Sequence, residues 1–317
     1  MERGKSNTEV AGIDVGKAWL DVAVHGQEAL IRLPNDEAGF KTLIGWLEEG
    51  CVRRVGLEAT GGYERGVRGA LDKAGFEVVV HQPIEVRLFA KLKRKRAKND
   101  RADARLIAAA TVQVDAVRAA QDPRLIELAE RLTAYEQVTD QAAEMKTFLE
   151  HVTLKDVAAL IRGQIRALEQ LKAKLAQQVL KTISVYPDLL ARFRLLLSLP
   201  GVGPIVAATV VVRMPELGQM KRGQAAALLG VAPFDRDSGQ FKGLRFIAGG
   251  RERPRRMLYL AALAAKRHDP GLKAFAQNLT DRGKPKKVAI VAVMRKLIEA
   301  ANLVLARGQP WQVRTQT

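Results

Sequence analysis

The sequence predicts an α/β domain followed by a mostly helical chain. Over the first hundred residues, short apolar runs of strand length alternate with turn residues and with segments of helical periodicity. From Pro123 to about Val185 there is no strand signal, and Gly163 is the only glycine. A chain of 317 residues with 47% hydrophobic residues is long enough for two packed domains, or for one domain with a long insertion.

The first domain is expected to contain five strands and three helices in the order β-β-β-α-β-α-β-α. Asp36 is expected to cap the first helix and Gly75 to end the second. This order favours a ribonuclease H-like sheet over a strictly alternating doubly wound fold. The strands are expected at 10–16, 19–26, 29–35, 52–58 and 76–83, and the helices at 36–49, 63–74 and 100–114.

The middle of the chain shows a heptad pattern, because Leu154, Ile161, Leu168 and Leu175 recur every seven residues. Residues 124–151 are also expected to be helical. The two helices either pack on their own domain as a hairpin or form a coiled coil between subunits, and the sequence leaves both open. The expected domains are 8–120, 121–186 and 187–310.

The last part of the chain is expected to be mostly helical, with helices at about 224–229, 254–268 and 285–306. The segment LPGVGP lies between two apolar runs and resembles the turn of a helix-hairpin-helix element. In such elements a glycine-rich turn lets backbone N–H groups approach a DNA phosphate.

The net charge is +18, from 52 Lys and Arg against 34 Asp and Glu. Such an excess favours a polyanionic partner, above all nucleic acid, with an anionic membrane surface as the other candidate. No apolar run is long enough to cross a bilayer and the first residues lack a signal-peptide pattern, so we expect a cytoplasmic protein. The single Cys51 and four scattered histidines argue against an intramolecular disulfide and a zinc site.

Three basic clusters, at 87–105, 242–256 and 282–296, are the expected nucleic-acid-binding surfaces. Binding there should weaken steeply as salt increases. The side chains expected to contact nucleic acid are Lys93, Arg94, Lys95, Arg96, Lys98, Arg101, Lys242, Arg245, Arg251, Arg255, Arg256, Lys286 and Lys287.

Four carboxylates are candidate metal ligands. Asp14 ends the first expected strand and Glu58 ends the fourth, and these two strands are neighbours in a ribonuclease H-like sheet. Asp100 and Asp103 begin a helix, three residues apart on one face, within the most basic stretch of the chain. Converging acids repel one another unless cations lie between them, and magnesium suits oxygen ligands that act on phosphate. Two ions would clamp the entering and leaving oxygens of a phosphodiester.

Taken one by one, these acids also have structural explanations: a turn residue, a helix cap, or first-turn acids that complement a helix dipole. The joint pattern favours a metal site, because two acids end strands and the other two lie in a basic segment. Asp21, on the expected hairpin partner of the first strand, is a weaker additional candidate.

The motifs GIDVGK, GLEATGGY and KNDRADA occur in this order in the first domain, followed by LPGVGPIVAATVV, LLGVAPFDRDSGQFKG and GGRERPRRMLYLAALAA. Together they resemble the DEDD-type transposases of bacterial insertion sequences, the insertion-sequence 110 family, over about residues 10–305. The resemblance implies a RuvC-like domain, a coiled coil and a second transposase domain that carries a serine nucleophile.

By this resemblance, Asp14, Glu58, Asp100 and Asp103 match the acids that hold magnesium, and Ser238 matches the nucleophilic serine. The resemblance also implies a structured noncoding bridge RNA that pairs with both donor and target DNA, so that base pairing reads the sequence. Recombination between two duplexes implies a homo-oligomer, either a dimer or a tetramer.

Two other functions remain open. The protein could be a metal-dependent nuclease of the Holliday-junction type, in which the acids activate water and Ser238 is only a loop residue. It could also be a non-catalytic nucleic-acid-binding scaffold. A covalent protein–DNA adduct distinguishes the recombinase from the nuclease, because only serine attack leaves the protein joined to the DNA.

Overall fold

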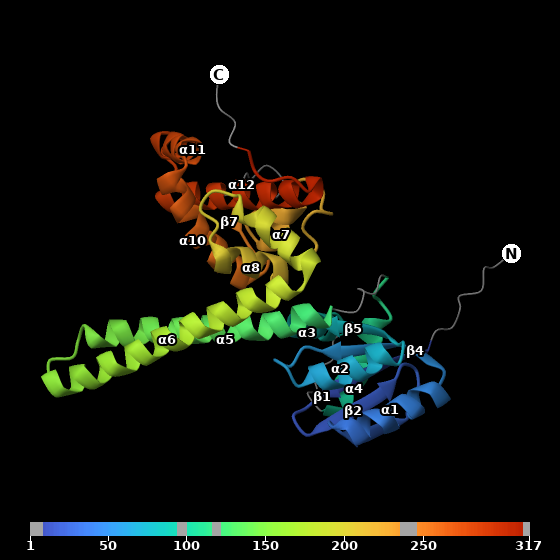
Figure 1. Ribbon diagram of the computed structural model, residues 1–317. Coiled ribbons are helices and arrows are strands. Elements are labelled where there is room, and N and C mark those ends of the chain that lie inside the picture. The colour runs from blue at the N-terminus through green and yellow to red at the C-terminus, as the bar shows by residue number, and fades with distance from the viewer. Residues whose placement is uncertain (1–8, 94–99, 116–121, 235–245, 313–317) are drawn as a thin grey trace. The chain divides into compact units, whose positions relative to one another are not determined.

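The computed structural model describes residues 9–93, 100–115, 122–234 and 246–312. It divides into two compact units, Met1–Gln121 and Asp122–Thr317 (Figure 1). No helix within these described ranges is long and apolar enough to cross a membrane.

The first unit is built on a five-stranded mixed sheet with the order β3-β2-β1-β4-β5. The strands β1, β2 and β3 are antiparallel neighbours, whereas β4 and β5 run parallel to β1. An antiparallel meander extended by two parallel strands through helical crossovers is the ribonuclease H-like arrangement, so the expected fold class is confirmed. The elements are β1 (Glu9–Val15), β2 (Trp19–Val24), β3 (Leu30–Pro34), α1 (Glu37–Glu49), β4 (Val52–Glu58), α2 (Glu64–Lys73), β5 (Glu77–His81), α3 (Pro83–Leu92) and α4 (Asp100–Thr111).

Alternation along the strands separates the two faces of this sheet. Ile13 of β1 and Leu57 of β4 belong to a buried core that also contains Leu43 of α1 and Val67 of α2. Helices α1 and α2 therefore cover this face. The intervening residues of each strand point to the opposite face, which α4 covers.

Helix α4 lies directly on the second face because two glycines leave room for it. A Cβ atom on Gly12 of β1 would collide with the backbone of Ala104 and Ala108, and a Cβ atom on Gly56 of β4 would collide with Thr111. The backbones of helix and sheet thus approach more closely than any residue with a side chain at these positions allows.

Helix α4 runs antiparallel to β1 and β4. Thr111 lies over Gly56, and Val114, beyond the last turn, accepts a 2.7 Å hydrogen bond from Arg54, which lies two residues earlier on β4. The helix therefore begins near the carboxyl ends of β1 and β4.

Helices α3 in the first unit and α11 in the second are not predicted by the sequence patterns. Both helices have a proline in the first turn, after a capping residue, Gln82 or Asp269. The α3 segment overlaps the basic cluster at 87–105, yet Val86 is buried against Ile107 of α4. The apolar face of α3 is short. The charged residues around it therefore dominate the sequence pattern of this segment.

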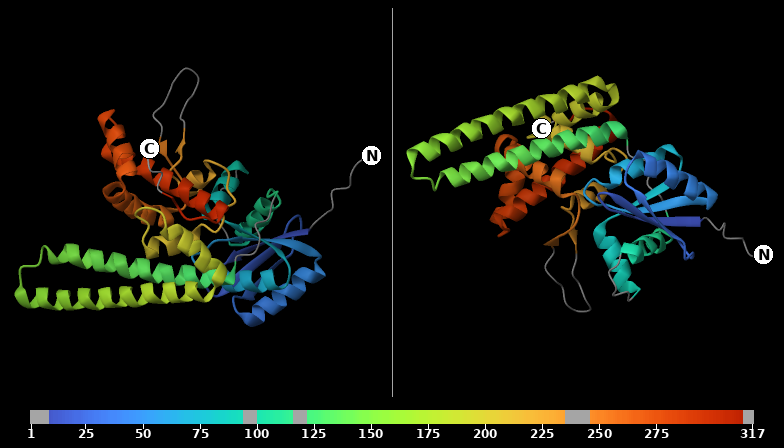
Figure 2. Two further views of the ribbon diagram at one scale, coloured as in Figure 1. Left: turned by 45° about the horizontal axis from the view of Figure 1, so that its top comes forward. Right: turned by 90° about the horizontal axis from the view of Figure 1, so that it is seen from below.

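The second unit begins with a helical hairpin. Helices α5 and α6 lie side by side in all views (Figures 1 and 2) and pack through Val138, Ala142 and Leu168. Two of the heptad residues, Ile161 and Leu168, are buried in this chain, so the pattern serves at least partly to close the hairpin. A coiled coil between subunits stays a prediction.

The base of the hairpin shares one core with the C-terminal helices. Leu128 of α5 and Ile183 of α6 belong to the same buried cluster as Val210, Leu258 and Val293. The division into functional domains at 8–120, 121–186 and 187–310 stays a prediction. The elements are α5 (Pro123–Leu149), α6 (Lys155–Val185), α7 (Pro187–Leu197), α8 (Pro204–Arg213), α9 (Gln224–Leu229), β6 (Pro233–Phe234), β7 (Phe246–Ile247), α10 (Glu252–His268), α11 (Pro270–Asp281) and α12 (Lys286–Arg307).

The LPGVGP turn connects α7 to α8, as expected for a helical hairpin element. Its Gly201 has a φ of +74°, and a Cβ atom there would collide with Ala261 and Ala265 of α10. This glycine is therefore required for close packing against α10. Contact of the turn with DNA phosphate stays a prediction.

Candidate active site

One polar side chain from each strand lies in a single row across the α4 face of the sheet. In the strand registers, Asp21 is paired with both Asp14 and Arg32, and Glu58 is paired with His81. Asp14 and Glu58 directly follow the last paired residues of the parallel strands β1 and β4, so these two acids are adjacent. The row consists of Arg32, Asp21, Asp14, Glu58 and His81, from β3, β2, β1, β4 and β5.

Sequence alternation places the two strand-end acids on the same face. Asp14 lies two residues after Gly12, and Glu58 lies two residues after Gly56, and both glycines face α4. Residues two apart on a strand point to the same side. The structure therefore brings Asp14 and Glu58 together at the edge where helix α4 begins.

Asp21, the weaker candidate, is held by an arginine. Arg32 donates from Nε and Nη2 to the two carboxylate oxygens of Asp21, at 2.8 and 2.7 Å. The Asp21 side chain is only 8% exposed. A bidentate pair of this kind neutralises the buried carboxylate and fixes its orientation, so Asp21 has a structural partner already.

Asp103 continues the side of helix α4 that faces the sheet. It precedes Ile107, which lies against Gly56, by four residues or one turn. Residues four apart on a helix share a face, so Asp103 lies one turn closer to the helix start, at the edge of the sheet that holds Asp14. The side chain of Asp100 lies outside the described residues.

Within the described side chains, no group of three or more His, Cys, Asp or Glu is arranged to hold a metal ion. Two strand-end acids are adjacent, and the helix with the other two begins at the same edge. Convergence of all four on magnesium stays a prediction.

A buried histidine ends the row on β5. His81 is 5% exposed, and its Nε2 atom lies 2.8 Å from the Thr111 hydroxyl of α4. Burial lowers the pKa of His81, while the nearby carboxylate of Glu85 opposes this shift. The histidine therefore favours the neutral form, and it links the strand beside Glu58 to the helix that carries the other acids.

The loop after Glu58 is held by another carboxylate. Glu64 Oε2 accepts hydrogen bonds from the backbone N–H groups of Thr60 and Gly62, at 3.1 and 2.8 Å, and from the Thr60 hydroxyl. Burial raises the pKa of Glu64, but these hydrogen bonds outweigh it and lower the pKa overall. The charged form of Glu64 thus orders the backbone that leads out of the site.

Ser238 lies in the segment 235–245, outside the described residues. The strands that flank this segment, β6 and β7, pair with each other, so its two ends are held together. Close packing next to this strand pair leaves no room for side chains, since a Cβ atom on Gly230 would collide with the Gly249 carbonyl and one on Gly250 would collide with the backbone of Gly230.

Several basic residues of the second unit have partners within the chain. Arg251 forms an ion pair with Glu216, with one hydrogen bond of 2.8 Å, and Arg256 pairs with Asp140. Arg255 donates to a backbone carbonyl. Lys93, Lys286 and Lys287 are exposed. The side chains of Arg94, Lys95, Arg96, Lys98, Arg101, Lys242 and Arg245 lie outside the described residues.

Family profiles match most of the chain. Residues 11–157 match DEDD_Tnp_IS110, described as a transposase, and residues 193–277 match the transposase IS116/IS110/IS902 family. Together with the ribonuclease H-like sheet and its strand-end acids, these matches define a DNA-processing enzyme of the transposase class. The chain belongs to the IS110 family of transposases.

Two relatives are similar over nearly their full length. The pilin gene-inverting proteins of Moraxella bovis and Moraxella lacunata are each 24% identical over 321 residues, covering 96% of this chain and 97% of the relative. Among solved structures, Thermus thermophilus RuvC with a Holliday junction substrate matches 33% of this chain and 92% of its own, at 18% identity and a TM-score of 0.27. A second RuvC structure from that organism gives 21% identity and a TM-score of 0.25.

Proposed function

We propose that this transposase is a recombinase that cuts and rejoins DNA through a phosphoserine intermediate at Ser238. The observation that supports this most is the adjacency of Asp14 and Glu58 at the strand edge where α4 begins. In the proposal, Asp14, Glu58, Asp100 and Asp103 hold magnesium, with two ions as the natural number for a phosphodiester.

The donor set fits magnesium. Asp14 and Glu58 offer hard carboxylate oxygens, and two adjacent carboxylates favour a cation between them. Asp21 adds no net charge to the site, because its carboxylate forms an ion pair with Arg32. Bound magnesium would stabilise negative charge that develops on the phosphate. The packing of α4 on Gly12 and Gly56 would hold these carboxylate oxygens in place.

Ser238 supplies the step that separates recombination from hydrolysis. Its Oγ forms a bond to phosphorus, the phosphodiester bond to one DNA oxygen breaks, and the serine proton passes, directly or through water, to that released oxygen, which becomes a free DNA hydroxyl. The phosphoserine link is again a phosphodiester, so the free hydroxyl of another strand can attack it and restore a DNA backbone. The family resemblance supports the assignment to this serine.

The partners in this proposal are double-stranded donor and target DNA, a noncoding bridge RNA, and further copies of the chain as a dimer or tetramer. The charge of +18 supports nucleic-acid partners. The family resemblance supports the guide RNA, and recombination between two duplexes supports the oligomer.

The test is a plasmid recombination assay. The gene is expressed with its native flanking noncoding DNA beside a donor and a target plasmid, and joined product is scored by sequencing across the junction. Wild type is compared with Ser238→Ala and Asp14→Asn. Two matched controls, Ser184→Ala and Glu49→Gln, change an exposed serine and an exposed acid that are not among the proposed site residues.

Joined product in wild type and both controls, and in neither site variant, is the expected result. Product that survives Ser238→Ala would remove the serine from the chemistry. Cleaved but unjoined DNA from the wild type would favour the nuclease instead.

A further inference from the structure

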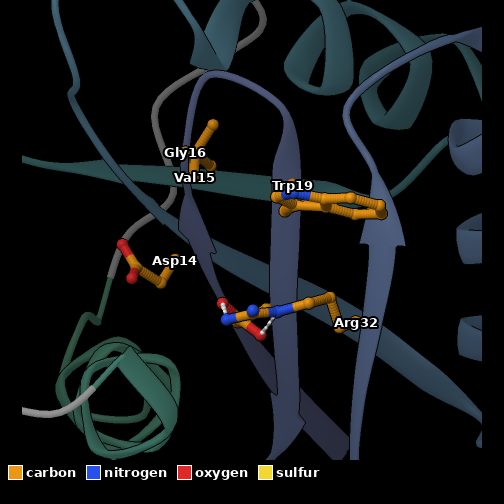
Figure 3. A pocket seen from close by; sticks show the side chains of 6 residues that line it. Asp14, Val15, Gly16, Trp19 and Arg32 are labelled. Atoms are coloured by element: carbon orange, nitrogen blue, oxygen red, sulfur yellow. Dashed lines mark hydrogen bonds and ion pairs between the residues drawn. The ribbon is translucent and has the colours of Figure 1, made fainter.

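A tryptophan stands exposed beside Asp14. Trp19, the first residue of β2, is 51% exposed. It lines a pocket of about 260 Å³ together with Asp14, Asp21 and Arg32 (Figure 3). Because Trp19 lies two residues before Asp21 on the same strand, it points to the α4 face, where the row of polar residues lies.

The fold does not explain this exposure. The sheet buries its apolar side chains on the other face, against α1 and α2. Trp19 belongs to neither side's buried core, and the chain has only three tryptophans. A large indole left half in solvent at a pocket mouth is typical of a surface that meets a ligand.

The charges of the pocket discriminate between parts of a nucleic acid. Arg32 is the cationic side chain among the residues that line the pocket, and its guanidinium is already engaged by Asp21 through the bidentate pair. The side chains of the pocket therefore offer a phosphate at the indole no available cation. A nucleobase is neutral, and its face stacks on an aromatic ring and on the plane of a guanidinium.

We propose that Trp19 stacks an unpaired nucleobase of the DNA strand whose phosphate is processed at Asp14. The inference rests on the proposed function, since that function places a DNA strand at this acid. The guanidinium of Arg32, on a side chain that is 51% exposed, lines the same pocket and offers a second flat surface for a base. A base inside a duplex already stacks on its neighbours, so the strand at this site must be locally unpaired.

The first experiment uses a chain in which Trp19 is the only tryptophan, with Trp46→Phe and Trp311→Phe. Tryptophan emission is followed while unlabelled single-stranded DNA, or a duplex of the same sequence, is added in magnesium-free buffer. Binding is measured in parallel by the anisotropy of labelled DNA. Single-stranded DNA is expected to quench Trp19 in step with binding, and more strongly than the duplex.

A second experiment keeps the other tryptophans. Trp19→Leu should weaken binding of single-stranded DNA about 5- to 100-fold, the loss of one stacked base, whereas Trp19→Phe should retain most of it. Trp311→Leu is the matched control, because Trp311 is also an exposed tryptophan but lies in the other unit. Circular dichroism establishes that the variants fold.

Unchanged Trp19 emission at saturating DNA, or equal affinity of Trp19→Leu and wild type, would overturn the inference. Emission that changes with protein concentration and not with DNA would assign Trp19 to a contact between copies and also overturn it. Both readouts concern binding, so they are independent of strand joining. Quenching without any recombination would leave the stacking intact and count against the proposed function alone.

Discussion

The Nε2 atom of His81 and the hydroxyl oxygen of Thr111 lie 2.8 Å apart and join β5 to α4 across β4. The hydroxyl passes over Gly56, where any Cβ atom would collide with it. It also donates a 2.7 Å hydrogen bond to the carbonyl of Ile107. Threonine has one hydroxyl proton, and the bond to Ile107 uses it. His81 is therefore the donor in its hydrogen bond with Thr111, and the imidazole proton is on Nε2.

Removing the Thr111 hydroxyl should therefore destabilise the first unit. Thr111→Val keeps the shape of the side chain but leaves the buried Nε2–H of His81 without an acceptor, which should cost about 1–3 kcal/mol of unfolding free energy. Thr111→Ser, the matched control, keeps the hydroxyl and should lose less. Urea unfolding followed by circular dichroism measures both. A Thr111→Val protein as stable as wild type would show that the bond does not hold α4 in place.

The buried histidine should also make stability depend on pH. Its pKa in the folded chain is lowered by burial, so between that pKa and the value of about 6.5 in the unfolded chain, the unfolded state binds more protons. The contribution of His81 is then complete above about pH 6.5 and is lost as the pH falls below that value. Wild type should lose unfolding free energy from pH 7 to pH 5 more steeply than His81→Gln. Parallel curves for the two proteins would contradict this assignment.

Substitution of the contact glycines should be severe. Gly12→Ala forces a Cβ atom into the backbone of α4, which cannot move aside without separating from the sheet, so at least about 3 kcal/mol should be lost. Gly45→Ala in α1 is the control, since a Cβ atom there meets open space. It should stabilise the chain by about 0.5–1 kcal/mol through helix propensity. Melting temperatures of the two variants should move in opposite directions.

The cluster of ion pairs around Glu136 in the second unit should contribute more to stability than the more exposed pair between Asp140 and Arg256. Glu136 accepts from Arg213 at 3.3 Å and from Arg253 at 2.6 Å, and the side chains of Glu136 and Arg213 are only about 15% exposed. Glu136→Gln leaves two guanidinium groups uncompensated and should cost about 2 kcal/mol. Asp140→Asn breaks the more exposed pair with Arg256 and should cost less than about 1 kcal/mol. Equal losses in urea unfolding would contradict the role given to burial.

The salt dependence of duplex binding should separate free from paired basic residues. Lys286 and Lys287 are exposed at the start of α12, whereas Arg256 is engaged with Asp140. If each lysine neutralises one phosphate, Lys286→Ala with Lys287→Ala should reduce the log–log slope by about 1.8. Arg256→Ala should change it little. The opposite order would mean that Arg256 leaves its partner to bind DNA.

Much of the first unit could be predicted because its signals are local. Asp36 caps α1 as expected, accepting a 2.9 Å hydrogen bond from Gly39. Apolar runs that end in an acid placed Asp14 and Glu58 at strand ends, and the element order made their strands neighbours. Pattern and propensity suffice where each strand is bounded by turn residues.

The remaining features depend on register and tertiary contact. Nothing in the sequence pairs His81 with Thr111, thirty residues away, until β5 is in register with β4 and α4 lies on Gly56. Arg32 and Asp21 became a pair through the register of two strands. Basic segments likewise show charge but not partners, so the engagement of Arg253 by Glu136, 117 residues away, was invisible.

The most direct test of the central claim is to trap the protein–DNA intermediate. Purified protein with its flanking RNA, magnesium and labelled donor DNA is stopped with detergent, and the covalent adduct is digested and sequenced by mass spectrometry. The predicted result is a nucleotide attached to Ser238, absent from Ser238→Ala and from Asp14→Asn. Cleavage of the DNA with no adduct, or an adduct on another residue, would contradict the account.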